Sequence, residues 1–255
     1  MADAKRHVVL VTGLSGLIGS AVCRHLDPAR YELRSLSRRA VAGVTSHRAD
    51  IGDLAAIQPA FTGVDTVVHL AAAVGNPGFD AVLHTNIVGT YNVFEAARRA
   101  GVARVLFASS GAVVSGWEGT EPYRALTEGR YEGLHGWPMM THETPLRPAG
   151  LYGASKVWGE ALARQYADAH GLSMICLRIG RVRAEDRPGA PREFTVWLSQ
   201  RDAARMIERC IAAPPGVRFE IFFVTSRNRW SYRDIDHARA VVGFEPVDAA
   251  EDHRT

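Results

Sequence analysis

The segment LYGASKVWGE, residues 151–160, places a tyrosine and a lysine four positions apart. On a helix this spacing puts Tyr152 and Lys156 on the same face, about 6 Å apart along the axis. An ammonium group at that distance is expected to lower the pKa of the phenol from its free value of about 10. Such a phenol could exchange a proton with a substrate hydroxyl or carbonyl group.

Lysine is rare in this chain, which makes its presence at position 156 informative. Lys5 and Lys156 are the two lysines among 30 lysine and arginine residues. An amine is a compact charge with several donors, and it can reach the ribose hydroxyls of a cofactor where the planar fork of arginine cannot fit. We therefore interpret Lys156 as a residue retained for one geometry.

The stretch TGLSGLIG, residues 12–19, follows the apolar run HVVLVT and opens a segment of helical period. In such a turn Gly13 permits a tight bend, Gly16 lets backbone amides approach a pyrophosphate, and Gly19 lets the helix lie close to the sheet. The turn predicts a dinucleotide-binding site, with a plain glycine-rich connection as the alternative. The residues expected to contact the dinucleotide here are Gly13, Ser15, Gly16, Leu17, Ile18 and Gly19.

The end of the second predicted strand lacks the acidic residue that would hold the adenosine ribose of NAD. The sequence there is SLSRRA, with Ser37, Arg38 and Arg39. A guanidinium group supplies bidentate donors to a 2′-phosphate, and no carboxylate is present to repel it. The sequence therefore predicts NADP as the cofactor, with NAD as the alternative; a solvated basic turn would explain the same residues without a cofactor.

Three other stretches are expected to border the cofactor. In HRADIGD, Asp50 and Ile51 follow a third strand and could bracket an adenine. In HLAAA, small side chains after the fourth strand leave room for the cofactor, whereas His69 is interpreted as a core histidine. The contacts expected from these stretches and from the later CLRIG stretch are Asp50, Ile51, Leu70, Ala71, Ala72 and Ile179.

Short apolar, β-branched runs alternate with longer segments of helical period. Continuous apolar strands indicate a parallel sheet whose two faces are both covered, because each crossover helix hides one side. The predicted class is α/β, a Rossmann-type doubly wound parallel sheet with helices on both faces. The apolar strands are expected at 7–12, 31–36, 65–70, 104–109, 173–178 and 218–224, and the helices at about 16–26, 53–61, 80–99, 149–170 and 199–212.

Two stretches interrupt this alternation. Residues 115–148 are rich in Gly, Pro, Trp, Tyr and Met and have no clear period, which is typical of a lid or a substrate loop. Residues 181–198 form a second irregular excursion, whose arginines could make an anion-binding wall or an ordinary solvated loop. We expect one NAD(P)-binding domain over 1–255 with both stretches inserted into it, which gives a small C-terminal substrate region.

Composition argues against several other function classes. The net charge of +3 is spread among 27 acidic residues and gives no electrostatic footprint for nucleic acid. No apolar run approaches the roughly 20 residues that span a bilayer, so no membrane partner is expected. Cys23, Cys176 and Cys210 lack the spacing of a metal site, so we expect no metal, and unpaired thiols indicate a cytoplasmic protein.

The glycine pattern at 13–19, the Y-x-x-x-K at 152–156 and the FASS at 107–110 together resemble the short-chain dehydrogenase/reductase superfamily, in its extended, epimerase/dehydratase branch. The resemblance spans nearly the whole chain. It implies that Tyr152 is the acid/base, that Lys156 orients the ribose and that Ser110 hydrogen-bonds the reacting oxygen. It also implies that Asn86, in HTNIVGT, lies near the site and contacts the cofactor.

Within this branch, the order and spacing of LYGASKVWGEALARQYADAHG, CLRIG and REFTVWLSQRD are similar to those of uronate dehydrogenases, which oxidise the anomeric carbon of hexuronic acids. By this resemblance Arg192 binds the substrate carboxylate through its bidentate fork, and Ser110 and Gly111 contact the substrate. We therefore predict an NADP-dependent oxidoreductase that transfers a hydride between nicotinamide and a hydroxyl or carbonyl carbon of a small, uronate-like substrate.

Other functions stay open at this point. Gly111 and Ala112 stand where dehydratases of the branch carry an acidic pair, which disfavours dehydration, and where uronate dehydrogenases carry Asn-His, which favours a less polar ketone as an alternative substrate. A sugar epimerase and a non-catalytic, NADP-sensing binding protein are further alternatives. The helices at 80–99 and 149–170 resemble those that pair across the dimer interface of the superfamily, which implies a homodimer.

Overall fold

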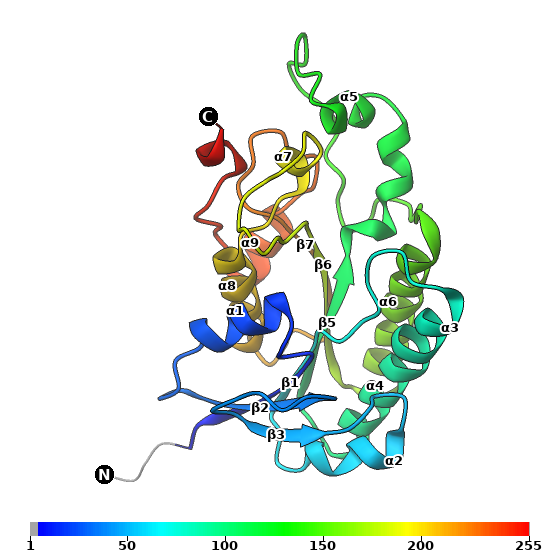
Figure 1. Ribbon diagram of the computed structural model, residues 1–255, viewed down its shortest axis with the longest axis vertical. Coiled ribbons are helices and arrows are strands. Elements are labelled where there is room, and N and C mark those ends of the chain that lie inside the picture. The colour runs from blue at the N-terminus through cyan, green and yellow to red at the C-terminus, as the bar shows by residue number, and fades with distance from the viewer. Residues whose placement is uncertain (1–4, 255) are drawn as a thin grey trace.

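A computed structural model describes residues 5–254, and over that range it contains one parallel β-sheet with helices on both faces (Figure 1). The strands lie in the order β3-β2-β1-β4-β5-β6-β7, and every neighbouring pair runs parallel. This arrangement confirms the predicted doubly wound α/β class. The strands are β1 (His7–Thr12), β2 (Tyr31–Ser37), β3 (Thr45–Arg48), β4 (Thr66–His69), β5 (Arg104–Ser110), β6 (Ser173–Ile179) and β7 (Phe219–Val224).

The crossovers between the strands are helical except for the connection from β2 to β3, and short 3-10 and π segments extend several of them. The α-helices are α1 (Leu17–His25), α2 (Leu54–Ile57), α3 (Phe79–Ala81), α4 (Gly89–Arg99), α5 (Tyr123–Glu128), α6 (Gly150–His170), α7 (Glu193–Val196), α8 (Gln200–Ile211) and α9 (Asp236–Val242). The 3-10 segments are η1 (Gln58–Phe61), η3 (Gly111–Val113), η4 (Ser115–Gly119) and η5 (Ala250–His253), and η2 (Val82–Val88) is a π-helix. Among residues 5–254, no helix has both the length and the apolar character that crossing a membrane requires.

Alternate residues of β1 serve two separate cores. Val9 and Val11 point into the cluster that α1 and α8 cover, whereas Val8 and Leu10 point into the cluster under α4 and α6. Successive side chains of a strand face opposite sides of the sheet, so a strand buried on both faces reads as a continuous apolar run. Figure 1 shows α1 and α8 on one side of the strands and α4 and α6 on the other.

The predicted elements are found with three differences. The helix expected at 53–61 is divided into α2 and η1, with Pro59 in the first turn of η1, where its missing N–H costs no helical hydrogen bond. The helix expected at 80–99 contains the π segment η2. The short helices α5, α7 and α9 were not predicted, because fewer than two turns leave too little periodicity to detect.

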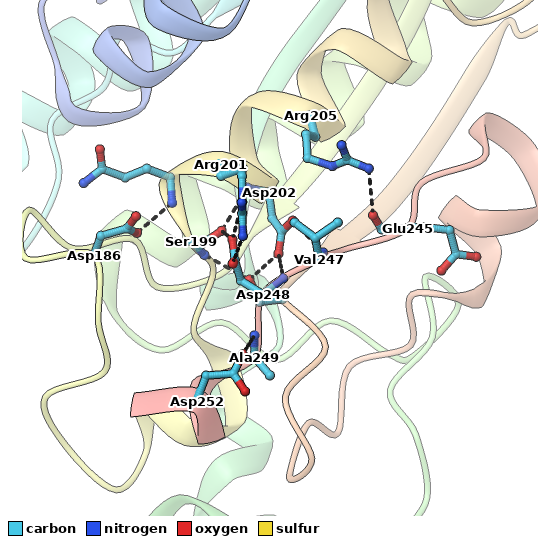
Figure 2. A network of polar contacts seen from close by, with 12 residues as sticks. Asp186, Ser199, Arg201, Asp202, Arg205, Glu245, Val247, Asp248, Ala249 and Asp252 are labelled. Carbon is cyan, nitrogen blue, oxygen red and sulfur yellow. Dashed lines mark hydrogen bonds and ion pairs between the residues drawn. The ribbon is translucent and has the colours of Figure 1, made fainter. Parts of the chain in front are cut away.

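The chain after β7 is fastened to the start of α8 by a buried carboxylate (Figure 2). Asp202 accepts hydrogen bonds from the hydroxyl of Ser226 at 2.7 Å and from the backbone N–H groups of Val247 at 2.8 Å and Asp248 at 3.1 Å. Ser199 caps α8 by accepting from the N–H of Asp202, and it also donates to Asp248. Both ends of the segment 226–248 are therefore held, and its helix α9 packs into the same core cluster as α8.

The sheet reverses its direction of winding between β1 and β4. The chain moves outward from β1 through β2 to β3, then crosses to β4 on the other side of β1. In open α/β sheets the crevice at such a reversal, outside the carboxyl ends of the strands, is where ligands bind. In Figure 1, α5 and α7, from the two irregular stretches, lie beyond this edge. The fold thus predicts a site between the first glycine turn and these stretches.

Candidate functional site

A cavity of about 1050 Å³ occupies this crevice. It runs from the turn after β1 to the ends of β5 and β6, and Arg181, Val182, Arg192 and Val196 of the stretch 181–198 line its wall. The predicted site residues that line it are Gly13, Ser15, Gly16, Leu17, Ile18, Gly19, Ser37, Arg38, Arg39, Asp50, Ile51, Leu70, Ala71, Ala72, Ser110, Gly111, Tyr152, Lys156, Ile179 and Arg192.

The glycine turn has the shape that a dinucleotide requires. Gly13 has φ +74°, and a side chain there would lie 3.0 Å from the backbone nitrogen of Ala71 on the neighbouring strand end. A Cβ on Gly19 would lie 2.5 Å from the backbone of Leu14. Helix α1 begins after Gly16 without a side-chain cap, so its first N–H groups can receive a ligand anion. These residues fit the pyrophosphate of a nicotinamide dinucleotide.

The adenosine end of the cavity carries two exposed arginines. Within residues 5–254, neither Arg38 nor Arg39 forms an ion pair with an acidic side chain. Ser37 donates its hydroxyl to the carbonyl of Arg39 and so shapes the turn. The carboxylate of Asp50 accepts from the N–H of Gly52 at 2.8 Å and from Nε2 of His84 at 2.9 Å, and these bonds lower the pKa of Asp50.

The structure corrects the expected cofactor contact of Asn86. Its side chain is 2% exposed and lies outside the lining of the cavity. The amide oxygen accepts from the N–H of Ala73 at 2.7 Å, and the amide nitrogen donates to the carbonyl of Ala73 and to the hydroxyl of Ser155. Asn86 therefore joins the loop after β4 to helix α6, and it supports the cavity wall from behind.

His69 is the core histidine that the sequence predicts. It is fully buried at the end of β4, and its two ring nitrogens form hydrogen bonds with the hydroxyls of Thr12 at 2.7 Å and Thr90 at 3.1 Å. Burial lowers the pKa of His69 to about 3, and the charge of nearby Lys156 adds to this effect. The imidazole is therefore neutral and structural.

Ser110, Tyr152 and Lys156 meet on one wall of the cavity. Ser110 is the last residue of β5, and the other two come from the first two turns of α6. Nζ of Lys156 lies 5.6 Å from the centre of the Tyr152 ring and 4.9 Å from that of Phe107. A hydrogen bond with Ser110 favours the phenolate of Tyr152. The three residues that sequence motifs selected from two distant segments are thus brought together.

The sequence predicts that the pKa of Tyr152 is lowered. For the groups of the chain itself, this predicted direction is wrong. Burial raises the pKa of Tyr152, and the opposing effect of Ser110 does not reverse this. Lys156 is only 2% exposed, and burial lowers its own pKa to about 7. Spacing alone indicates two neighbouring groups, but it does not show that water is excluded from both, and exclusion disfavours the charged form of each.

Arg192 lines the cavity, but its fork is already engaged. Its Nε donates to Glu118 at 2.6 Å and an Nη donates to the same carboxylate at 2.8 Å. Glu118 belongs to the stretch 115–148 and also accepts from the hydroxyl of Tyr232 at 2.6 Å. Arg192 was expected to bind the carboxylate of the substrate, but the carboxylate that it binds in the structure is that of Glu118.

Arg233 is a residue of the cavity wall that sequence reasoning missed. It follows β7 in the segment 226–248, and no recognised motif includes it. Its guanidinium lies against Gly111, where a Cβ would be 2.1 Å from Nη1. The absence of a side chain after Ser110 was the available signal, because it indicates that another group fills that space.

The comparisons with known proteins agree with this geometry. The family model described as "NAD dependent epimerase/dehydratase family" matches residues 9–212. The chain is 37% identical to an NAD-dependent glucose-6-phosphate dehydrogenase of Haloferax volcanii, over 94% of this chain and 93% of that protein. It is 32% identical to a uronate dehydrogenase of Pseudomonas putida, over 96% and 86%. A uronate dehydrogenase mutant of Agrobacterium tumefaciens, solved with NAD, superimposes with a TM-score of 0.80 at 29% identity, over 97% and 87%.

The buried lysine leads to a prediction about stability. We expect Lys156→Met to raise the melting temperature of the protein without ligands by several degrees, since each kcal/mol corresponds to about 2–4 °C in a chain of this size. Because the pKa of Lys156 falls from 10.5 to about 7 on folding, the wild-type penalty is complete below about pH 7 and fades toward pH 10.5. The gain measured by thermal denaturation should therefore be largest at pH 6 and small at pH 10.

Lys5 provides the matched control, because it is the other lysine and is exposed. Lys5→Met should leave the melting temperature unchanged at both pH values. A melting temperature for Lys156→Met that is lower than wild type at pH 6 would contradict the idea that the amine is held at a desolvation cost.

Proposed function

Because the chain belongs to the NAD dependent epimerase/dehydratase family, we propose that it is a nicotinamide-dependent dehydrogenase of a small, sugar-derived substrate of the uronate type. The observation that carries the proposal is the meeting of Ser110, Tyr152 and Lys156 on the wall of a cavity whose other end is the glycine turn. The relatives named above, a sugar phosphate dehydrogenase and a uronate dehydrogenase, support the substrate class.

Each of the three residues has one role in this proposal. The hydroxyl of Tyr152 exchanges the proton of the reacting oxygen, and the hydroxyl of Ser110 hydrogen-bonds that oxygen. When bound, the nicotinamide ring accepts or returns the hydride of the substrate carbon. Lys156 donates to the ribose hydroxyls, and its charged form favours the phenolate that burial otherwise opposes. Gly13, Gly16 and Gly19 admit the pyrophosphate.

Arg233 bears on the choice between polar and apolar substrates. A cationic group that fills the space beside Gly111 argues against the less polar ketone, because an apolar substrate would leave the guanidinium desolvated without a partner. We also propose that the stretches 115–148 and 181–198 form the substrate region of a single domain over 1–255, with Glu118 and Arg192 as their contact.

Replacing the tyrosine tests the function directly. Tyr152→Phe should lower kcat by about 10²–10⁴-fold for the sugar that the wild-type protein oxidises, because it removes the proton-transferring hydroxyl and keeps the ring. Turnover is followed by the absorbance of the reduced dinucleotide. The dissociation constant of the dinucleotide, measured by fluorescence titration, should be the same in Tyr152→Phe as in wild type. Tyr91→Phe, on the exposed face of α4, is the control that should keep full activity. Unchanged turnover in Tyr152→Phe would refute the assignment.

We propose NADP as the preferred cofactor, on the basis of the two arginines at the adenosine end that have no acidic partner in the described part of the chain. Arg38→Ala should raise KM for NADP about 10–100-fold and change KM for NAD little, because the guanidinium would contact the 2′-phosphate alone. Arg48→Ala, an exposed arginine of β3 outside the cavity lining, is the control. A wild-type kcat/KM that is clearly higher with NAD would overturn this preference.

We propose that two copies pair through η2, α4 and α6. Exposed apolar side chains, including Leu83, Val88 and Tyr91, lie on this face. The double variant Leu83→Glu, Val88→Glu should halve the mass measured by light scattering, while Val247→Glu, an exposed apolar site elsewhere, should not. A wild-type protein of single-chain mass would refute the homodimer. The free thiols Cys23, Cys176 and Cys210 support a cytoplasmic setting.

A further inference from the structure

Arg233 is buried beside the residue that contacts the reacting oxygen in the proposed function. Its side chain is 2% exposed, and it lines the cavity together with Ser110 and Gly111. A Cβ on Gly111 would lie 2.1 Å from Nη1 and 2.2 Å from Cζ of Arg233, so only glycine leaves room for this guanidinium. The positive charge of Arg233 therefore lies against Gly111, the residue that follows Ser110.

The charge of Arg233 is only partly neutralised by the chain. Within residues 5–254, its one ion pair is with Oε1 of Glu118, at the long distance of 3.7 Å. That oxygen already accepts from Tyr232 at 2.6 Å and from Arg192 at 2.8 Å. Two guanidinium groups thus share one carboxylate, and the cluster of Glu118, Arg192 and Arg233 keeps a net charge of about +1.

The hydrogen-bonding capacity of Arg233 is also not fully used. Its Nε is buried without a partner among the described residues. The rings of Tyr232 and Phe223 lie 5.7 and 5.9 Å from its Cζ and hold the group in place, but they accept no strong hydrogen bond. A buried charge without full compensation is costly, and burial accordingly lowers the pKa of Arg233. An anionic ligand would supply the missing acceptors.

We propose that Arg233 is the specificity-determining residue that selects a sugar carrying an anionic group, a carboxylate or a phosphate. The inference rests on the proposed function and names its substrate class. The carboxylate of Glu118 occupies the fork of Arg192, so the substrate anion pairs with Arg233. A neutral hydroxyl would satisfy one donor but would leave the net charge of the cluster uncompensated.

Binding measurements test this independently of turnover. Calorimetric titration of the protein saturated with reduced dinucleotide uses three probes: D-glucuronate, D-glucose 6-phosphate and D-glucose. Wild type should bind at least one of the anionic sugars about tenfold or more tightly than glucose. The comparison of the two anionic probes distinguishes a carboxylate ligand from a phosphate ligand.

Two variants then assign the preference to Arg233. Arg233→Gln should weaken binding of the preferred anionic sugar about 10–100-fold and that of glucose less than about threefold, and Arg233→Lys should lie between Arg233→Gln and wild type. Arg227→Met, an exposed arginine of the same segment outside the cavity lining, should bind all three sugars as wild type does.

Several outcomes would overturn the inference. They are wild-type binding of glucose as tight as that of both anionic sugars, no binding of either anionic sugar, or an equal loss for charged and neutral sugars in Arg233→Gln. If Arg233→Gln does not fold, the wild-type comparison and Arg233→Lys decide. Selective binding of an anionic sugar without reduction of either dinucleotide would support the role of Arg233 and refute the proposed dehydrogenase.

Discussion

The buried ion pair between Glu160 and Arg178 fixes the geometry on which the site depends. Both side chains are almost fully buried, and the guanidinium donates from Nε at 3.0 Å and from Nη2 at 2.9 Å to the two carboxylate oxygens. Glu160 also accepts from Ser109 at 2.6 Å. One residue of α6 is therefore bound to the ends of both β5 and β6. Glu160 lies one turn after Lys156 on the same helix face, so this contact sets how far α6 can slide or turn. Removing either partner of such a pair would leave an uncompensated buried charge.

The basic side chains around the cavity differ in how completely their charge is balanced. Arg178 has a bidentate carboxylate partner, and so does Arg192. Among the described residues Lys156 and Arg233 have no such partner, although each is 2% exposed. Lys156 and Arg233 are therefore buried cations with incomplete compensation, and both line the cavity with Ser110. Burial would be too costly for both groups in a purely structural role, since apolar residues of similar size would pack there without a desolvation penalty.

The sequence predicts the parts of the site that lie within one element or one turn. Strand runs, the glycine turn and the four-residue spacing of Tyr152 and Lys156 are local patterns with a fixed physical meaning. The cluster of Glu118, Arg192 and Arg233 is different, because its members come from three irregular segments with no period to relate them. The pKa direction of Tyr152 could not be predicted for a related reason: spacing gives a neighbour, whereas solvation depends on everything that covers the pair.

The stretch 115–148, which lies outside the sheet, sets the net charge of the cluster of Glu118, Arg192 and Arg233 at the substrate end of the cavity. Trp137 donates to the carbonyl of Ser231 at 2.9 Å, and the N–H of Met140 donates to the carbonyl of Tyr232 at 2.7 Å. These bonds fix this stretch to the segment that carries Arg233. Tyr131 stacks on Trp230 with ring centres 4.0 Å apart and adds an apolar contact between the stretch and the segment. The same stretch supplies Glu118, the one acid of the cluster. Because positioning and neutralisation come from one insertion, a change in its length would alter both where Arg233 lies and how much of its charge reaches the substrate. Specificity can then diverge while the sheet and the register of α6 stay the same.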